Sequence, residues 1–192
     1  MIDKQFVEQM AKYNRWQNAN LYICGDALSD EDRKRERGAF FGSIHATLNH
    51  LLWADRMWMH RFAGMEKPSG DLKASVAHTP DWQDLKHERE SFDEVILRWA
   101  ESLDPAWLDG ELTWVSGAAH MEITRPKWIL VTHMFNHQTH HRGQVHCMIT
   151  QCGLKPRDTD LPFMMPASVD VCPIHDKSWK RVIHRNRKII AA

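Results

Sequence analysis

Apolar and polar residues alternate along much of this chain with the period of an α-helix. Between Phe6 and Cys24, one stripe of side chains recurs at steps of three and four residues, which predicts an amphipathic helix. A second helix is expected from about Phe40 to Phe62, because this stretch lacks proline and is rich in Leu, Ala, Met and Trp. The charged segment 28–38 between them predicts a connector with one helical turn.

Two further helices are expected in the second half of the chain. Thr79 and Pro80 suit the N-cap and first position of a helix, and an apolar series follows them from Leu85 to Leu103. A last long helix should run from about Pro126, which suits a helix start, to Gly153, which suits a helix end.

A short β-hairpin is expected between the third and fourth helices. Residues 111–115 and 120–124 contain Thr, Trp, Val and Ile, which favour strands, and Ser116-Gly117-Ala118-Ala119 between them favours a turn. The pattern therefore predicts an all-α fold: a four-helix bundle with a small β-hairpin before the fourth helix and an irregular C-terminal extension. We assign residues 1–164 to the bundle domain and 165–192 to the extension.

Charge and hydropathy exclude some classes of partner. Lys plus Arg and Asp plus Glu are balanced at 25 each, so no net charge favours nucleic acid. No apolar run approaches the roughly 20 residues that cross a bilayer, and the N-terminus lacks a signal peptide, so we expect a cytoplasmic protein without membrane contact. A small-molecule substrate or a protein partner is then expected. The basic segment 174–192 could touch RNA or an acidic partner, but a solvated terminal helix is the commoner structure for such a sequence.

The 13 histidines of the chain suggest its chemistry. On the fourth predicted helix, His137 and His141 lie one turn apart and only about 40° apart around the axis, so their rings can converge on one ion. Apolar residues such as Leu130 and Met134 share this face, which places the pair toward the core. A lone core histidine is usually satisfied by hydrogen bonds, but two at this spacing need several partners or a cation.

The second predicted helix offers a third ligand. His45 and His50 are about 140° apart around the axis, so only one of them can face inward. His50 shares a small and apolar stripe with Ala54 and Met57, whereas His45 falls beside Arg56, on the side that we expect to face outward. The pattern thus predicts a metal site formed by His50 with the two histidines of the fourth helix.

The sequence is less specific about which residues support the predicted ligands and about which metal they bind. His133, His140 and Gln144 lie close enough on the fourth helix to orient the ligand rings, although His140 could instead face another helix. Three imidazoles leave open positions, as catalytic sites do, and they suit zinc, nickel, iron or copper. Zinc or nickel is our first expectation and iron an alternative. No carboxylate is spaced with these histidines to complete the sphere.

Three motifs in the chain resemble those of the bacterial DinB-like proteins, DNA-damage-inducible metal binders. They are Tyr13-Asn14-Arg15-Trp16 with Asn18, the segment from Ser43 to His50 followed by Ala54-Asp55-Arg56 and Trp58, and Asn136-His137-Gln138-Thr139-His140-His141-Arg142-Gly143-Gln144. The resemblance covers about residues 6–163. It implies a four-helix bundle, usually dimeric, with a metal held by His50, His137 and His141.

Two classes of function follow from the site and the resemblance. Similar proteins include thiol-dependent transferases and isomerases, so the first is a metal-dependent enzyme that uses a low-molecular-weight thiol. A metal-dependent hydrolase is its variant, because a bound metal also acidifies water. The second class is a non-catalytic metal-binding protein of the stress response. We also expect a homodimer, since nine tryptophans in a bundle of this size leave aromatic surface to bury.

Overall fold

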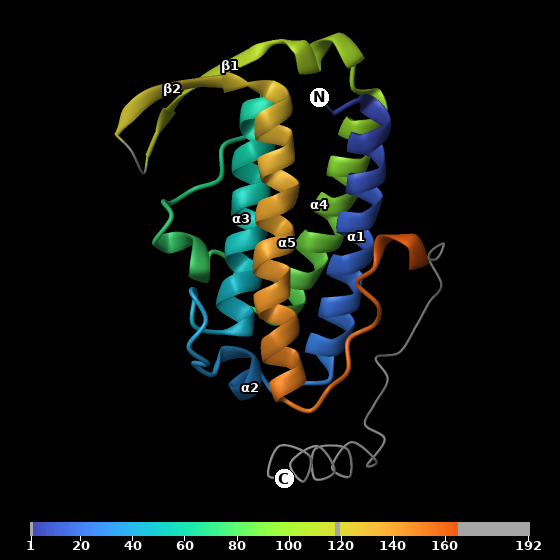
Figure 1. Cartoon of the computed structure of the whole chain (residues 1–192). Helices are drawn as coiled ribbons and strands as arrows, with labels where there is room; N and C mark the ends of the chain where they lie inside the picture. The colour runs from blue at the N-terminus through green and yellow to red at the C-terminus, as the bar shows by residue number, and fades with distance from the viewer. Residues whose placement is uncertain (1, 118–119, 165–192) are drawn as a thin grey trace, which may run out of the picture.

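The structure, a computed structural model, describes residues 2–117 and 120–164 and is built around four long helices (Figure 1). These are α1 (Lys4–Asp26), α3 (Ile44–Ala63), α4 (Trp82–Ser102) and α5 (Lys127–Gln151). The shorter elements are α2 (Asp30–Lys34), η1 (Ala74–Ala77), η2 (Pro105–Asp109), β1 (Glu111–Ser116), β2 (Met121–Pro126) and η3 (Leu161–Phe163). The predicted all-α fold with a hairpin before its last long helix is confirmed. The predicted extension, 165–192, lies outside the described residues, so the domain boundary at 164 stays a prediction.

The four long helices enclose two buried apolar clusters with a polar layer between them. α1 packs against α4 and α5, and α3 packs against the same two helices. The cluster nearer the hairpin includes Ile96 and Leu130, and the cluster at the other end includes Leu48 and Val145. Every long helix contributes buried polar side chains at the level between the two clusters: Asn14, Asn18, His50, Asp55, Arg89, Asp93, Gln138, His141 and Arg142.

The start of α3 differs from the prediction in a way that affects the site. The helix begins at Ile44 rather than Phe40, because the Ser43 hydroxyl oxygen accepts the Ala46 N–H at 3.2 Å and caps the first turn. Phe40 and Phe41 instead form a turn, closed by a bridge from Ala39 to Gly42, whose φ of 78° suits glycine. The prediction that both phenylalanines are helical is therefore wrong.

The other helix ends are capped by side chains and glycine. The N-cap of α4 is Asp81, whose Oδ1 accepts the N–H groups of Gln83 and Asp84 at 2.8 and 3.0 Å, so the prediction of Thr79 as cap is wrong. The α5 helix begins directly after Pro126 and ends before Gly153, which has a φ of 81°.

The two β-strands pair antiparallel, and segment 154–164, which we call the strap, crosses the bundle beside α1 (Figure 1). The Tyr13 hydroxyl donates to the Thr159 carbonyl at 2.6 Å, and Gln17 Nε2 donates to the Asp158 carbonyl at 2.9 Å. These bonds fix the strap on α1. No helix among the described residues is both long and apolar enough to cross a membrane.

Candidate metal centre

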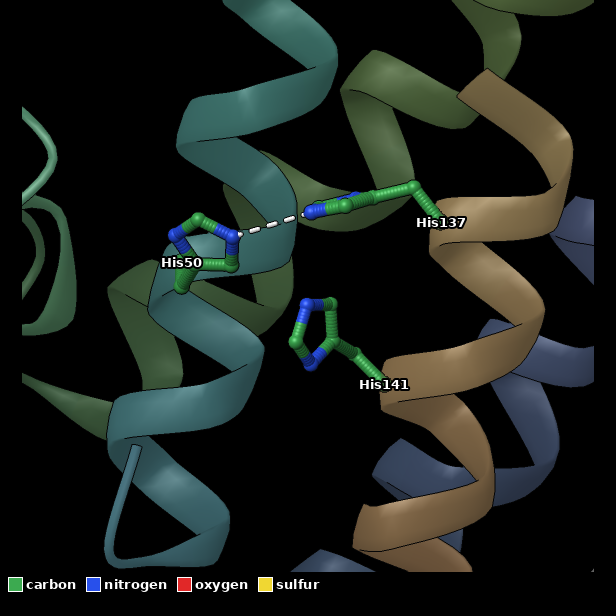
Figure 2. A group of neighbouring side chains, drawn as sticks. All are labelled: His50, His137 and His141. Carbon is green, nitrogen blue, oxygen red and sulfur yellow. Dashed lines mark hydrogen bonds between the residues drawn. The ribbon is translucent and has the colours of Figure 1, made fainter. Parts of the chain in front are cut away.

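Three histidines from two helices meet at the level of the polar layer. His50 projects from α3, and His137 and His141 project from successive turns of α5, so that the three rings point toward one another (Figure 2). The Nε2 atoms of His50 and His137 are 3.2 Å apart. One ring nitrogen from each residue lies within 4.8 Å of the other two. The structure thus brings together the three residues that the helical pattern selected.

The spacing of these nitrogens suits a shared metal ion. Two imidazoles that bind one tetrahedral zinc at about 2.0–2.1 Å hold their nitrogens about 3.3 Å apart. The His50–His137 separation of 3.2 Å is close to that value, and a movement of the His141 ring by a rotamer adjustment would complete the trio. Among the described residues, the group consists of the three histidines alone. These three residues could therefore hold a metal ion with imidazole ligands alone.

Two hydrogen bonds set the ring nitrogens that face the centre of the trio. The Ser75 hydroxyl donates to the Leu72 carbonyl at 2.6 Å, so its oxygen accepts from His50 Nδ1–H at 2.9 Å. On α5, Gln144 Oε1 accepts from His141 Nδ1–H at 2.9 Å. Because each Nδ1 carries the proton, the lone pairs of His50 and His141 lie on Nε2; that of His50 accepts from His137 Nε2–H in the structure, and a cation could take the place of this proton. The predicted role of Gln144 agrees with this contact.

Burial keeps the histidines neutral. Desolvation lowers the pKa of His50 to about 4 and that of His137 to about 3, and the neighbouring histidines add to the effect. The pKa of His141 is also lowered, mainly by burial. A metal binds only the unprotonated ring, so the burial of this trio favours a cation over protons near neutral pH.

Aromatic side chains cover part of the trio. The Phe41 ring stacks on His50 with centroids 3.9 Å apart and lies 5.1 Å from the His141 ring. Phe40, 76% exposed, lies 6.5 Å from His141 and forms an apolar edge open to solvent. His50 and His141 are buried, whereas His137 is only partly so. His137 is therefore the most solvent-exposed member of the trio.

The comparison with known proteins agrees with this geometry. The model of the DinB family matches residues 1–176. The chain belongs to the DinB family. It is also 26% identical over 160 residues to Protein DinB of Bacillus subtilis (strain 168), a match that covers 81% of this chain and 91% of that protein. DinB-family membership and a close histidine trio together fit metal binding.

Asn14, Asp55, Gln138 and Arg142, which lie in the three motifs quoted above, belong to the buried polar layer together with Arg89 and Asp93 of α4. Arg89 donates to Asp55 at 2.7 Å and pairs with Asp93 at 2.9 Å. Gln138, which follows His137, donates to the same Asp55, and Arg142, which follows His141, donates to Asn14 of α1. Each of the two trio histidines on α5 is thus followed by a side chain that bonds to another helix, which fixes the rotation of α5 about its axis.

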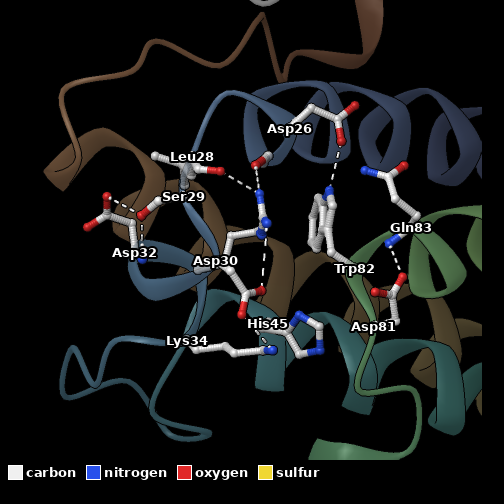
Figure 3. A network of polar contacts seen from close by, with 12 residues as sticks. Asp26, Leu28, Ser29, Asp30, Asp32, Lys34, His45, Asp81, Trp82 and Gln83 are labelled. Atoms are coloured by element: carbon white, nitrogen blue, oxygen red, sulfur yellow. Dashed lines mark hydrogen bonds and ion pairs between the residues drawn. The ribbon is translucent and has the colours of Figure 1, made fainter.

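The structure corrects the prediction for His45. This residue is 4% exposed, not outward-facing, because α2 and the start of α4 cover the side of α3 opposite the trio. Its Nε2 lies 3.1 Å from the Thr79 carbonyl, and its ring is 6.1 Å from that of Trp82. Figure 3 shows His45 among the polar contacts at this end of the bundle. His45 does not join the trio, as predicted, although it is a core residue.

The predicted supporting histidines lie beside the trio. His140 is exposed, with its ring 4.8 Å from that of His141, and His133 has its ring 5.8 Å from that of His137. Sequence reasoning missed two contacts, Ser75 and Phe41. Neither could be found by helical periodicity, because both lie outside α3 and α5, the two helices that carry the trio.

A cavity of about 1150 Å³ lies elsewhere, between α1, α4, the end of α5 and the strap. Trp16, Asp93 and Phe163 are among the residues that line it, and none of the three histidines does so. The trio and this cavity are therefore separate features of the molecule.

Proposed function

We propose that the protein is a metal-dependent enzyme of the small-thiol transferase type, with the metal bound by His50, His137 and His141. The observation that carries the proposal is the set of converging Nε2 atoms, two of them oriented by Ser75 and Gln144. A divalent ion bound there would act as a Lewis acid that lowers the pKa of a thiol or of water. Zinc and nickel suit three imidazoles best, and iron is the alternative.

The chain itself would contribute ligand positioning and partial exclusion of water. Three protein ligands leave at least one position of a tetrahedral sphere for a small molecule. The half-buried His137 marks the approach, and Phe40 and Phe41 supply an apolar edge beside His141 and His50. An apolar edge of this kind suits the carbon body of a thiol or of its electrophilic partner.

Metal analysis followed by a binding assay tests the proposal. The protein is purified, its metal is replaced by cobalt, and thiols are titrated while the sulfur-to-cobalt charge-transfer band is recorded. A saturable band with wild type, absent from the His137→Ala variant, supports a thiol enzyme. Turnover of an ester or amide without any thiol band would instead support the hydrolase variant. Bound metal with neither result would indicate the non-catalytic stress-response role.

We further propose that the protein is a homodimer. The apolar side chains of Val115 and Met121 on the hairpin are 72% and 59% exposed, and Ile129 at the start of α5 is 39% exposed. A dimer that buries this end would remove these side chains from water. Light scattering at micromolar concentration should give twice the mass of the chain, and a monomer mass would refute the proposal.

A further inference from the structure

Arg61, near the C-terminal end of α3, is a cation held by aromatic rings. Its guanidinium lies 4.6 Å from the centroid of Trp58 and 5.5 Å from that of Trp114 on β1. The side chain is partly buried, and burial lowers its pKa from the ordinary value. Within 2–117 and 120–164, no carboxylate or carbonyl accepts a hydrogen bond from Arg61. A half-buried cation without an anion is unusual, because its hydration is partly lost and nothing replaces it.

The way Arg61 is held leaves its hydrogen-bonding edge available. The guanidinium carbon of Arg61 lies over the rings of both Trp58 and Trp114, and such cation–π contacts do not require an N–H hydrogen bond to an oxygen acceptor. The N–H donors lie in the plane of the guanidinium and form a fork that matches the two oxygens of a carboxylate. The two indole rings therefore hold the position of the charged group, while its N–H donors have no oxygen acceptor among the described residues.

Arg61 lies on the same face of α3 as the metal ligand His50. Eleven residues separate them, which is about three helical turns and leaves an angle of only about 20° around the axis. Along α3 this is about 16 Å between Cα atoms, and the arginine side chain leans back toward the N-terminus, shortening the gap. The two residues therefore face the same side of the bundle.

Aromatic and apolar side chains lie between His50 and Arg61. From the trio toward Arg61, the ring centroids of His137 and His133 are 5.8 Å apart, and those of His133 and Trp58 are 5.3 Å apart. On α3, Ala54 and Met57 lie between His50 and Arg61 and belong to a small apolar cluster outside the two main ones. The face thus has imidazole nitrogens at one end, an apolar middle and a cation at the other end.

We propose that Arg61 binds the carboxylate of a substrate whose opposite end is held at the histidine trio. The inference rests on the proposed function and names its substrate class: an elongated anionic thiol, in which several bonds separate the sulfur from a carboxylate. The thiol loses its proton to solvent when the sulfur binds the metal, and the carboxylate forms charge-assisted hydrogen bonds with the guanidinium fork. A short thiol cannot span both ends and gains nothing from Arg61.

The test compares thiols of matched length and different charge on the cobalt-substituted protein. Glutathione carries carboxylates far from its thiol, its diethyl ester has the same length with the carboxylates masked, and thioglycolate is short. Binding is read from the charge-transfer band for wild type, Arg61→Gln and the control Arg98→Gln, an exposed arginine of α4. Cobalt content and circular dichroism verify that each variant is folded and loaded.

Wild type and Arg98→Gln should bind glutathione about tenfold to a hundredfold more tightly than its diethyl ester, the range expected for hydrogen bonds to a charged group. Arg61→Gln should lose this preference, with thioglycolate affinity unchanged. An equal preference in Arg61→Gln and wild type would overturn the role of Arg61 and leave the thiol function standing.

A second measurement separates the two proposals. S-methylglutathione has no free thiol but keeps both carboxylates, and its binding is followed through the ¹⁵N–¹H signal of Arg61 Nε. If no thiol gives a band and this signal still shifts saturably, the thiol function fails and the anion site stands. If no thiol gives a band and the signal does not move, both proposals fail.

Discussion

Replacing His50 or His45 by alanine distinguishes a proposed metal ligand from a structural histidine on one helix. Both residues are buried in α3, at 3% and 4% exposure, and both rings contact a neighbouring segment. Only His50 has a nitrogen within reach of His137 and His141. We therefore expect His50→Ala to lose metal binding and His45→Ala to retain it. The two variants are well matched, because each removes the same side chain from a similar depth.

The size of the effect follows from the number of ligands. Zinc sites with four protein ligands bind with about 10–16 kcal/mol, or roughly 3–4 kcal/mol for each ligand. Loss of His50 should then weaken metal binding by about a hundredfold to a thousandfold. Loss of His45 removes its hydrogen bond to Thr79 and leaves a cavity beside Trp82, which should cost about 2–4 kcal/mol of folding free energy, with the metal affinity unchanged.

Two assays distinguish these outcomes. Competition with a chelator gives the metal affinity of each variant, and thermal unfolding with and without metal gives the stabilisation by the ion. Metal at a thousand times the wild-type dissociation constant should stabilise wild type and His45→Ala by about 4 kcal/mol, and His50→Ala by only about 0.4–1.4 kcal/mol. Equal affinities in the two variants, or loss in His45→Ala alone, would refute the assignment of the trio.

Three other changes test the surroundings of the trio. Ser75→Ala removes the acceptor of His50 Nδ1–H and should weaken metal binding by about tenfold to a hundredfold. The control Ser91→Ala, at an exposed position of α4, should leave metal binding unchanged, and chelator competition measures both affinities. Burial lowers the pKa of His50 to about 4 and that of His137 to about 3, so protons should compete only weakly with the metal. The metal affinity should therefore change little between about pH 7 and pH 5. A steep fall in affinity below about pH 6.5, where free histidine titrates, would contradict the lowered pKa values. Asp55→Asn removes a charge buried beside Arg89 and should lower the free energy of unfolding in urea by about 3–5 kcal/mol, and a loss under about 1 kcal/mol would show that the network is not a paired one.

Helical periodicity was sufficient to find the three candidate ligands. His137 and His141 share a face through their spacing alone, and His50 shares its face with Ala54 and Met57. Periodicity failed for His45, because it assumes that a helix has one buried face. The α3 helix is covered on several sides by α2, η1, α4 and α5, and most of its side chains are buried, so no outward side was available at His45.

Contacts between distant segments could not be predicted from the sequence. Ser75 lies in a short 3-10 turn, 25 residues from His50, and its position depends on how the segment after α3 folds back. Phe41 reaches His50 because the Ser43 cap makes α3 begin only at Ile44. Phe41 therefore lies in the turn before the helix. Local propensity favoured a helix through Phe40 and Phe41, and a single side-chain cap was enough to override it.

The polar layer explains how the chain keeps α5 in a fixed rotation relative to α3, which the histidine trio requires. Apolar side chains such as Ile96 and Val145 pack without direction, so the two apolar clusters alone would allow α5 to rotate by small angles. Hydrogen bonds are directional, and Gln138 to Asp55 and Arg142 to Asn14 tie α5 to α3 and α1 beside the ligand histidines. Buried ion pairs add little net stability, so their value here lies in fixing orientation. A rotation of α5 by one residue, about 100°, would turn both His137 and His141 away from His50, and these two bonds oppose that rotation.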